Sequence, residues 1–240
     1  MTSGVAFSRM SNKRIIVAID GPAGAGKSTI ARRIADRLGF VYINTGAMYR
    51  AVALWALRNG TELSDMHRLE KLAQEAKIEF RAGDGRVILN GEDVTDMLRT
   101  PEVSAAASVV SAVPGVRKAL LPLQREIAKN SSVVMEGRDI GSVVFPEAQV
   151  KVFLDAHPHE RARRRTVDLN GTEQEATEMN DVAAAIRERD SRDRSRRDAP
   201  LMQAPDAELI DSTALTIEQV EDEILRLVRS RTSNGKEVYR

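Results

Sequence analysis

The stretch RIIVAIDGPAGAGKSTIARRIADRL, residues 14–38, decides the fold. It begins with a continuous apolar run that ends at an acid, a pattern typical of a buried strand in a parallel sheet. A glycine-rich segment follows, and then Ile30, Ile34 and Leu38 recur at the spacing of one helix face, which Gly39 is expected to end. The order of strand, glycine loop and helix predicts an α/β fold.

Four more apolar runs alternate with helical sequence further along the chain. They are VYI at 41–43, SSVVMEGRD at 131–139, VKVFLDA at 150–156 and AELIDST at 207–213. Together with the first run they predict a five-stranded, parallel, doubly wound sheet. Ligands of such sheets bind beyond the carboxyl ends of the strands, where the charged residues that close these runs are expected to lie.

Residues 78–94, IEFRAGDGRVILNGEDV, have a different pattern. Apolar residues alternate on both sides of AGDG, which predicts a small antiparallel hairpin inserted into the α/β chain. Residues 99–130 are expected to be helical with an interruption at Pro114 and Gly115, and 158–197 to be helical and highly charged.

The composition excludes several classes of function. The 240-residue chain has 42% hydrophobic and 30% charged residues, as soluble globular proteins do. Its net charge of +1 provides no overall attraction to nucleic acid or to membranes. It has no cysteine, so disulfides, thiolate metal sites and cysteine nucleophiles are excluded, and its three histidines lack the spacing of a helical metal site. No apolar run has the roughly 18–20 residues that a membrane span requires, and we expect a cytoplasmic protein.

GPAGAGKS at 21–28 matches the phosphate-binding pattern GxxxxGK[ST]. The glycines allow successive backbone N–H groups to face one anion, and the helix that follows points its positive end at the same place. Lys27 is expected to reach the β- and γ-phosphates of a nucleoside triphosphate, and Ser28 to bind Mg²⁺. The residues expected to bind ATP in this segment are Gly21, Pro22, Ala23, Gly24, Ala25, Gly26, Lys27, Ser28 and Thr29.

A second set of residues indicates a second anionic ligand. Arg50 follows Tyr49 in NTGAMYR, Arg117 lies in PGVRK, and Arg138 with Asp139 comes directly after an expected strand. One guanidinium group can bind two phosphate oxygens at once. Several arginines at one pocket therefore suggest that a nucleoside monophosphate binds there. The chain has neither the base-reading element of a regulatory GTPase nor the strand ending in consecutive acids of a motor ATPase.

The sequence resembles the bacterial cytidylate kinases, within the P-loop nucleoside monophosphate kinases, from about Arg14 to Arg229. The resemblance is carried by IDGPAGAGKST, NTGAMYRAVAL, GEDVTDMLRTPEVS, VRKALLPLQR, EGRDIGSVVFPEA, KVFLDA, ERARRR, IRERDSRDRSRRDAP and DSTALTIEQV. Two of these signals, GRDIGSVVFP and RDSRDRSR, are not shared with P-loop proteins in general. The family's fold is a three-layer P-loop fold with a monophosphate-binding insertion, here the hairpin region, and a helical lid. Its reaction implies transfer of the γ-phosphoryl of ATP to CMP or dCMP with Mg²⁺.

The resemblance also implies roles for single residues. Tyr49 would pack near the pyrimidine, Arg117 and Asp139 would contact the cytosine, and Asp193 the sugar hydroxyls. The residues that the resemblance assigns to CMP are Thr45, Tyr49, Arg50, Arg117, Arg138, Asp139, Arg189 and Asp193. Thr45 stands where the family often has serine, and Glu136 where aspartate is also common. Glu136 is expected to reach Mg²⁺ directly or through a water molecule.

The arginine-rich segment RERDSRDRSRR, residues 187–197, has three interpretations. On a helix, Arg189, Arg192 and Arg196 share one face, where they would neutralise the transferred phosphate and where Asp193 would orient Arg189. The alternatives are a solvated, salt-bridged helix and an RNA-binding arm, although the segment has no aromatic residue for base stacking. ERARRR at 160–165 would add Arg164 and Arg165 toward ATP, and the polar segment 166–180 is expected to be a mobile lid.

We therefore expect a cytoplasmic, monomeric kinase whose partners are ATP and CMP or dCMP, without nucleic acid or membrane. The expected catalytic residues are Lys27, Arg138, Arg189, Arg192 and Arg196. The expected division is a leader at 1–13, a single kinase domain at 14–230 and a tail at 231–240. Within the domain, the core comprises 14–44, 118–157 and 198–230, the monophosphate-binding subdomain 45–117, and the lid about 158–197. The alternatives are a P-loop kinase acting on UMP, AMP or a sugar-like acceptor, and a nucleotide-dependent RNA-binding protein.

Overall fold

The computed structural model describes residues 14–81, 85–170 and 176–232. The expected leader at 1–13 and the greater part of the expected tail, 233–240, lie outside the described residues. The tip of the expected hairpin at 82–84 and the middle of the expected lid at 171–175 also lie outside them.

A five-stranded parallel sheet forms the centre of the fold, with the strand order β2-β6-β1-β7-β8. The strands are β1 (Ile16–Asp20), β2 (Val41–Asn44), β6 (Val133–Gly137), β7 (Val150–Asp155) and β8 (Glu208–Asp211). All five strands expected from the apolar runs are confirmed. Asp20 is paired with Gly137 of β6 and with Phe153 of β7, so the carboxyl ends of the three central strands meet at one edge.

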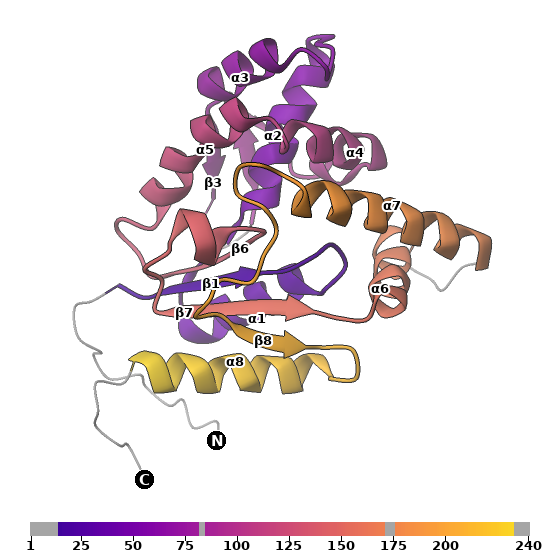
Figure 1. Ribbon diagram of the computed structural model, residues 1–240. Helices are drawn as coiled ribbons and strands as arrows, with labels where there is room; N and C mark the ends of the chain where they lie inside the picture. Colours follow the sequence, from indigo (N-terminus) through magenta and orange to yellow (C-terminus); the bar gives the residue numbers. More distant parts are fainter. Residues whose placement is uncertain (1–13, 82–84, 171–175, 233–240) are drawn as a thin grey trace.

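Helices cover both faces of this sheet, because successive side chains of each strand point in opposite directions. Val17 and Ile19 of β1 pack with α1 (Lys27–Leu38) and α8 (Ile217–Thr232). Ala18, between them, faces the other core, which is built by the helices α2 (Thr45–Arg58), α3 (Met66–Glu75), α4 (Pro101–Val110) and α5 (Pro114–Ile127). Figure 1 shows α1 and α8 below the sheet and α2 to α5 above it. Each fully buried aliphatic side chain of these cores contributes about 1.5–3 kcal/mol.

The expected antiparallel insertion is also confirmed. β3 (Ile78–Phe80) pairs with β4 (Val87–Leu89), and β4 pairs with β5 (Glu92–Asp93). A 3₁₀ turn, η1 (Met97–Arg99), leads from this small sheet into α4.

The highly charged region forms two helices, α6 (Pro158–Asn170) and α7 (Ala176–Arg194). They lie beside the carboxyl ends of β1, β7 and β8 (Figure 1). Another short turn, η2 (Ile140–Val144), follows β6 directly at the same edge of the sheet. The elements that carry most of the charged candidates are thus gathered where α/β proteins bind their ligands.

Three expected boundaries differ in the structure. The interruption expected at Pro114 and Gly115 lies before them, because Pro114 begins α5, where its missing N–H costs nothing. α7 ends at Arg194, so Arg196 follows the helix instead of lying on its face. α8 continues to Thr232, beyond the expected start of the tail at 231.

Among the described residues, no single helix has both the length and the apolar composition to cross a membrane. α4 and α5 meet those criteria only as a pair bent by 100°, and their apolar side chains pack into the core shared with α2.

Gly21 is the glycine on which the junction of β1 and the following loop depends. Its φ is +148°, and a Cβ atom there would lie 2.0 Å from the carbonyl oxygen of Leu154 in β7.

We expect Gly21→Ala to lower the free energy of unfolding by about 3 kcal/mol or more, since backbone atoms of the central sheet would have to move. Gly60→Ala is the matched control, because Gly60 has a φ of +61° with nothing within 4 Å of the added Cβ. It should cost only about 1 kcal/mol. Equal losses in urea unfolding would contradict this prediction.

Candidate active site

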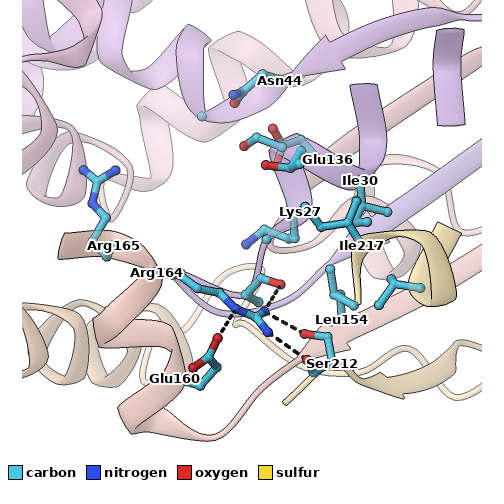
Figure 2. A pocket seen from close by; sticks show the side chains of 18 of the residues that line it. Lys27, Ile30, Asn44, Glu136, Leu154, Glu160, Arg164, Arg165, Ser212 and Ile217 are labelled. Atoms are coloured by element: carbon cyan, nitrogen blue, oxygen red, sulfur yellow. Dashed lines mark hydrogen bonds and ion pairs between the residues drawn. The ribbon is translucent and has the colours of Figure 1, made fainter. Parts of the chain in front are cut away.

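A cavity of about 470 Å³ opens at the carboxyl edge of the sheet. Its floor is the loop between β1 and α1, and its walls come from β6, α6, α7 and the segment that joins β8 to α8. One end is apolar, where Ile30, Leu154, Leu215, Ile217 and Val220 line it, and the middle is lined by arginines. Figure 2 shows the two ends, with Ile30, Leu154 and Ile217 on one side of Lys27 and Arg165 on the other.

The loop itself has the shape of an anion cradle. Gly24 and Gly26 have φ of +76° and +88°, which side-chain-bearing residues rarely adopt. α1 begins directly after them at Lys27, so the unpaired N–H groups of its first turn point toward the cavity. The cavity lining includes the loop from Ala23 to Thr29, whereas Gly21 and Pro22 lie beneath it.

Lys27 is nearly buried, with 6% of its surface exposed, and its Nζ donates to the carbonyl oxygen of Pro22 at 2.6 Å. Burial lowers the pKa of Lys27 to about 7, and the neighbouring Arg138 lowers it further, against the opposing effect of Glu136. A lysine held in this state gains its full charge when an anion arrives beside it.

Arginines surround the cavity without an equal number of acids. Arg50, Arg138, Arg164, Arg165 and Arg189 all line it. Burial lowers the pKa of Arg189 to about 9, with a further lowering by Arg138. Burial also lowers the pKa of Arg50. Within the described part of the chain, the Nε–H group of Arg189 has no hydrogen-bond partner. The repulsion and the unsatisfied donor both favour an anionic ligand with several oxygens.

Two of these arginines differ in how they are held. Arg164 donates to Glu160 at 2.8 Å and to the hydroxyl and carbonyl oxygens of Ser212 at 2.9 and 2.7 Å (Figure 2). Its guanidinium is therefore fixed beside the phosphate-binding loop. In the same view no hydrogen bond or ion pair joins Arg165 to the other residues shown, and its side chain stands apart from this network.

A smaller cavity of about 40 Å³ adjoins the first. Arg117 and Asp139 form an ion pair in its wall, with 10% and 8% of their side chains exposed. The guanidinium of Arg117 also lies over the ring of Tyr49, 5.4 Å from its centre. A carboxylate and a guanidinium that are held side by side next to an aromatic ring provide both an acceptor and donors for a planar polar ligand.

The two cavities share part of their lining. Gly46, Gly137, Arg138 and Arg189 belong to both. An anion in the phosphate-binding loop and an anion in the smaller cavity would therefore meet at Arg138 and Arg189.

Asp193 holds the arginines of the shared wall. It is 1% exposed, accepts from Nε of Arg138 at 2.9 Å and pairs with Arg196. Burial acts to raise the pKa of Asp193, but the combined charge of Arg138, Arg196 and Arg189 holds it below the usual value. Asp193 thus accepts from Arg138 and pairs with Arg196, and the charge of Arg189 acts on it as well; the expected orientation of Arg189 by Asp193 stays a prediction.

Glu136 and Ser28 lie on the side of the loop where a metal ion is expected. Tyr42 donates to Oε1 of Glu136 at 2.6 Å, and its hydroxyl lies near Ser28. Burial raises the pKa of Tyr42, and the Glu136 carboxylate raises it further. No group of three or more metal-binding side chains occurs in the described ranges. One hydroxyl and one carboxylate suit Mg²⁺, which keeps several waters and takes its other ligands from substrate phosphates.

Comparisons with known proteins agree with this geometry. The family model described as cytidylate kinase matches residues 17–230. The cytidylate kinase of Solibacter usitatus is 60% identical over 226 residues, which cover 94% of this chain and 97% of that protein. The cytidylate kinase of Geobacter sulfurreducens is 49% identical over 227 residues, 94% of this chain and 97% of that protein.

The chain belongs to the cytidylate kinase family.

Among solved structures, an uncharacterized protein from Eubacterium ventriosum is similar in fold alone. Its TM-score is 0.52 at 14% sequence identity, over 91% of this chain and 100% of that one.

For a member of the cytidylate kinase family, two of the expected ligand-binding residues make contacts within the protein. The backbone N–H of Ala23 donates to Asp190 at 3.0 Å and its carbonyl accepts from Arg161, so neither group faces the cavity for ATP. Arg192 lines neither cavity; it donates to Ser108 of α4 at 2.7 Å and to Glu188 at 2.6 Å. Its place on the catalytic face stays a prediction, as do the ligand contacts of the other residues.

Sequence reasoning missed three polar residues beside the site, of which Asp20 and Asp190 are buried and Tyr42 is half-buried. Asp190 and Tyr42 are described above. The third is Asp20, whose carboxylate accepts from the N–H groups of Ile140 and Gly141 at 2.8 and 2.7 Å, which fixes the turn after Arg138 and Asp139. Burial raises the pKa of Asp20 to about 7, although these two N–H groups oppose it. The only sign of Asp20 in the sequence was its position at the end of the first apolar run.

The lowered pKa of Lys27 predicts that ATP binding takes up protons. At pH 8.5 Lys27 of the free protein is mainly neutral, whereas the phosphates of bound ATP raise its pKa and restore the charge. We expect uptake of nearly one proton (~1) per ATP, and an affinity that falls as the pH rises above about 7. Calorimetry in buffers of different ionisation enthalpy measures this uptake.

Lys27→Arg is the control for the proton measurement, because an arginine stays charged over this pH range. Its uptake should be close to zero. Equal uptake by both proteins would assign the proton to another group and contradict the prediction.

Proposed function

We propose that this chain transfers the γ-phosphoryl of ATP to CMP or dCMP, giving ADP and CDP or dCDP. Family membership supports cytidylate as the acceptor. The observation that carries the proposal is the shared lining of the two cavities, which brings the phosphate-binding loop and the Arg117–Asp139 pair to the same two arginines. A triphosphate in one cavity and a monophosphate in the other have their reacting phosphates next to each other.

In the acceptor cavity, we infer that Asp139 accepts from the amino group of cytosine and that Arg117 donates to its ring acceptors. Tyr49 packs beside the base, and Asp193 reaches the sugar hydroxyls. The acceptor phosphate lies between Arg50 and Arg138, close to the hydroxyl of Thr45, which donates to the carbonyl oxygen of Glu136 at 2.8 Å.

In the donor cavity, the N–H groups of the loop and Lys27 hold the β- and γ-phosphates of ATP. Arg164 and Arg165 lie along the triphosphate, and the apolar end accommodates the adenine. In the reaction, an oxygen of the CMP phosphate attacks the γ-phosphorus and the bond from that phosphorus to the β–γ bridging oxygen breaks, leaving the electron pair on ADP. Lys27, Arg138, Arg189 and Arg196, with Arg192 on a closing lid, neutralise the charge that the three equatorial oxygens share.

Ser28 and Glu136 would hold Mg²⁺, Ser28 directly and Glu136 directly or through water. Bound there, the ion neutralises charge on the β- and γ-phosphate oxygens. Tyr42 holds the Glu136 carboxylate through its hydrogen bond of 2.6 Å before any metal arrives.

We also propose the division of the chain that the sequence suggests: a core at 14–44, 118–157 and 198–230, a monophosphate-binding subdomain at 45–117, and a lid at about 158–197. We propose a monomer and a cytoplasmic role in pyrimidine nucleotide metabolism.

Base selectivity gives the first test of this function. Lys27→Ala should abolish transfer, and Asp139→Ala should lower kcat/KM for CMP at least about tenfold more than for UMP, because only cytosine offers an amino donor to the carboxylate. A panel of CMP, dCMP, UMP, AMP, GMP and sugar acceptors with labelled ATP measures both. Comparable turnover of CMP, AMP and GMP by the unaltered protein would refute the assignment, and RNA binding without acceptor-dependent ADP release would favour the nucleic-acid alternative.

The metal site gives the second test. Glu136→Gln should raise the Mg²⁺ concentration for half-maximal transfer about tenfold, because a neutral amide binds the ion or its waters less strongly than a carboxylate does. Tyr42→Phe, which removes only the hydroxyl that donates to Glu136, should have a smaller effect in the same direction. Binding of Mn²⁺ with ATP, followed by electron paramagnetic resonance, should weaken in parallel. CMP affinity measured without metal is the control, and it should not change.

A further inference from the structure

The two backbone groups of Ala23, in the middle of the phosphate-binding loop, are both bonded to helices far away in sequence. Its N–H donates to Oδ1 of Asp190 in α7 at 3.0 Å, and its carbonyl oxygen accepts from Nη1 of Arg161 in α6 at 3.0 Å. Arg161 and Asp190 also pair with each other, and Nε of Arg161 donates to the carbonyl oxygen of Ala156 at 3.0 Å. The loop is therefore held from outside by a buried ion pair.

The backbone and apolar side chains around the Arg161–Asp190 pair also pack closely against the loop. A Cβ atom on Gly24 would lie 2.5 Å from the carbonyl oxygen of Arg161, so the backbone of α6 rests directly on the loop. Ala23, Ala162 and Ile186 form a small apolar cluster of their own, separate from the two cores that flank the sheet. The start of α6 and the middle of α7 thus form one packed unit with the loop.

Because the Arg161–Asp190 ion pair is buried, its stability depends on the additional hydrogen bonds that the two side chains form. Arg161 is 5% exposed and Asp190 is 3% exposed. A buried ion pair is stable only when its geometry and additional hydrogen bonds compensate for lost hydration, and removing one partner leaves a charge without compensation. Here the additional bonds go to the backbone of Ala23, so a change in either side chain is transmitted to the loop.

Neither residue lines a nucleotide cavity. Their effect on the reaction has to pass through the loop, and the loop carries the N–H groups that face the triphosphate. Asp190 does lie next to Arg189 in sequence, but Arg161 is on α6, away from the acceptor side.

We propose that Arg161 and Asp190 are positioning residues that fix residues 21–24 of the loop in the shape that receives the phosphates of ATP. Through the hydrogen bonds of Arg161 and Asp190 to Ala23, α6 and α7 support the loop. The inference rests on the proposed ATP-dependent transfer. It requires that loss of the pair weakens the binding of ATP and leaves the binding of CMP unchanged.

The experiment compares Asp190→Asn and Arg161→Lys with the unaltered protein. Asparagine keeps an acceptor for Ala23 but loses the charge, and lysine keeps the charge but lacks the planar fork that reaches Asp190, Ala23 and Ala156 together. Glu221→Gln is the matched control, because Glu221 is a buried carboxylate, 2% exposed, that pairs with Arg33 and Arg37 on the far side of α1.

Calorimetry with ATP alone and with CMP alone measures affinity without requiring any transfer. Both variants should weaken ATP binding about tenfold and leave CMP binding within about twofold. The control should leave both affinities within about twofold. The double variant should lose no more ATP affinity than the more affected single variant, because either change breaks the same pair.

Hydrogen exchange gives a second measurement that does not depend on nucleotide. Peptides that cover residues 21–26 should exchange faster in both variants and at the normal rate in the control. If Asp190→Asn fails to fold, the charge-retaining Arg161→Lys decides the question.

Unchanged ATP affinity in a folded variant, equal losses for ATP and CMP, or additive losses in the double variant would each overturn the proposal. Absence of transfer by the unaltered protein, with the ATP losses still present, would refute the proposed function and leave the role of the pair intact.

Discussion

The gathering of positive charge at one edge of the sheet is the constraint on which the rest of the structure depends. Lys27, Arg50, Arg138 and Arg189 lie close enough to oppose one another's charge, and burial adds to the cost, as the lowered pKa values of Lys27 and Arg189 indicate. In water these groups would move apart. Here strands, loops and helices hold them together, so the protein without nucleotides has an arrangement that anionic ligands stabilise.

Buried carboxylates make this arrangement possible, and each has a separate partner. Asp193 bonds to Arg138 and Arg196, Asp139 to Arg117, and Asp190 to Arg161. Asp20 differs, because within the described part of the chain it bonds to backbone N–H groups and to no arginine. The acids therefore fix where the cations stand and leave donor groups open toward the cavities. Catalysis of phosphoryl transfer depends on such placement in advance, since charges that need not reorganise stabilise the transition state most.

The sequence predicted the fold almost completely and the site in part. The strands were predicted from continuous apolar runs and the hairpin from its alternating apolar residues. Burial of both faces or of one face of a strand produces these patterns in the sequence. The loop, Arg138 and Asp139 followed from short motifs at strand ends. Asp190, Tyr42 and the bonds of Ala23 did not, because each depends on partners far away in sequence: 167 positions separate Ala23 from Asp190, and 94 separate Tyr42 from Glu136. The end of α7 before Arg196 also could not be read from charge spacing.

In the segment RERDSRDRSRR, helical spacing alone does not show what each arginine contacts. Arg187, Arg194 and Arg197 are exposed, whereas Arg192 donates to Ser108 of α4 and Arg196 pairs with Asp193 from beyond the end of the helix. Asp190 and Asp193 are more buried than any arginine of the segment. Asp190 anchors α7 to the phosphate-binding loop, and Asp193 anchors it to the end of β6. Two acids three positions apart thus fasten one helix face to both nucleotide cavities. The acids orient the segment, and the orientation then decides which arginines reach phosphate and which reach water.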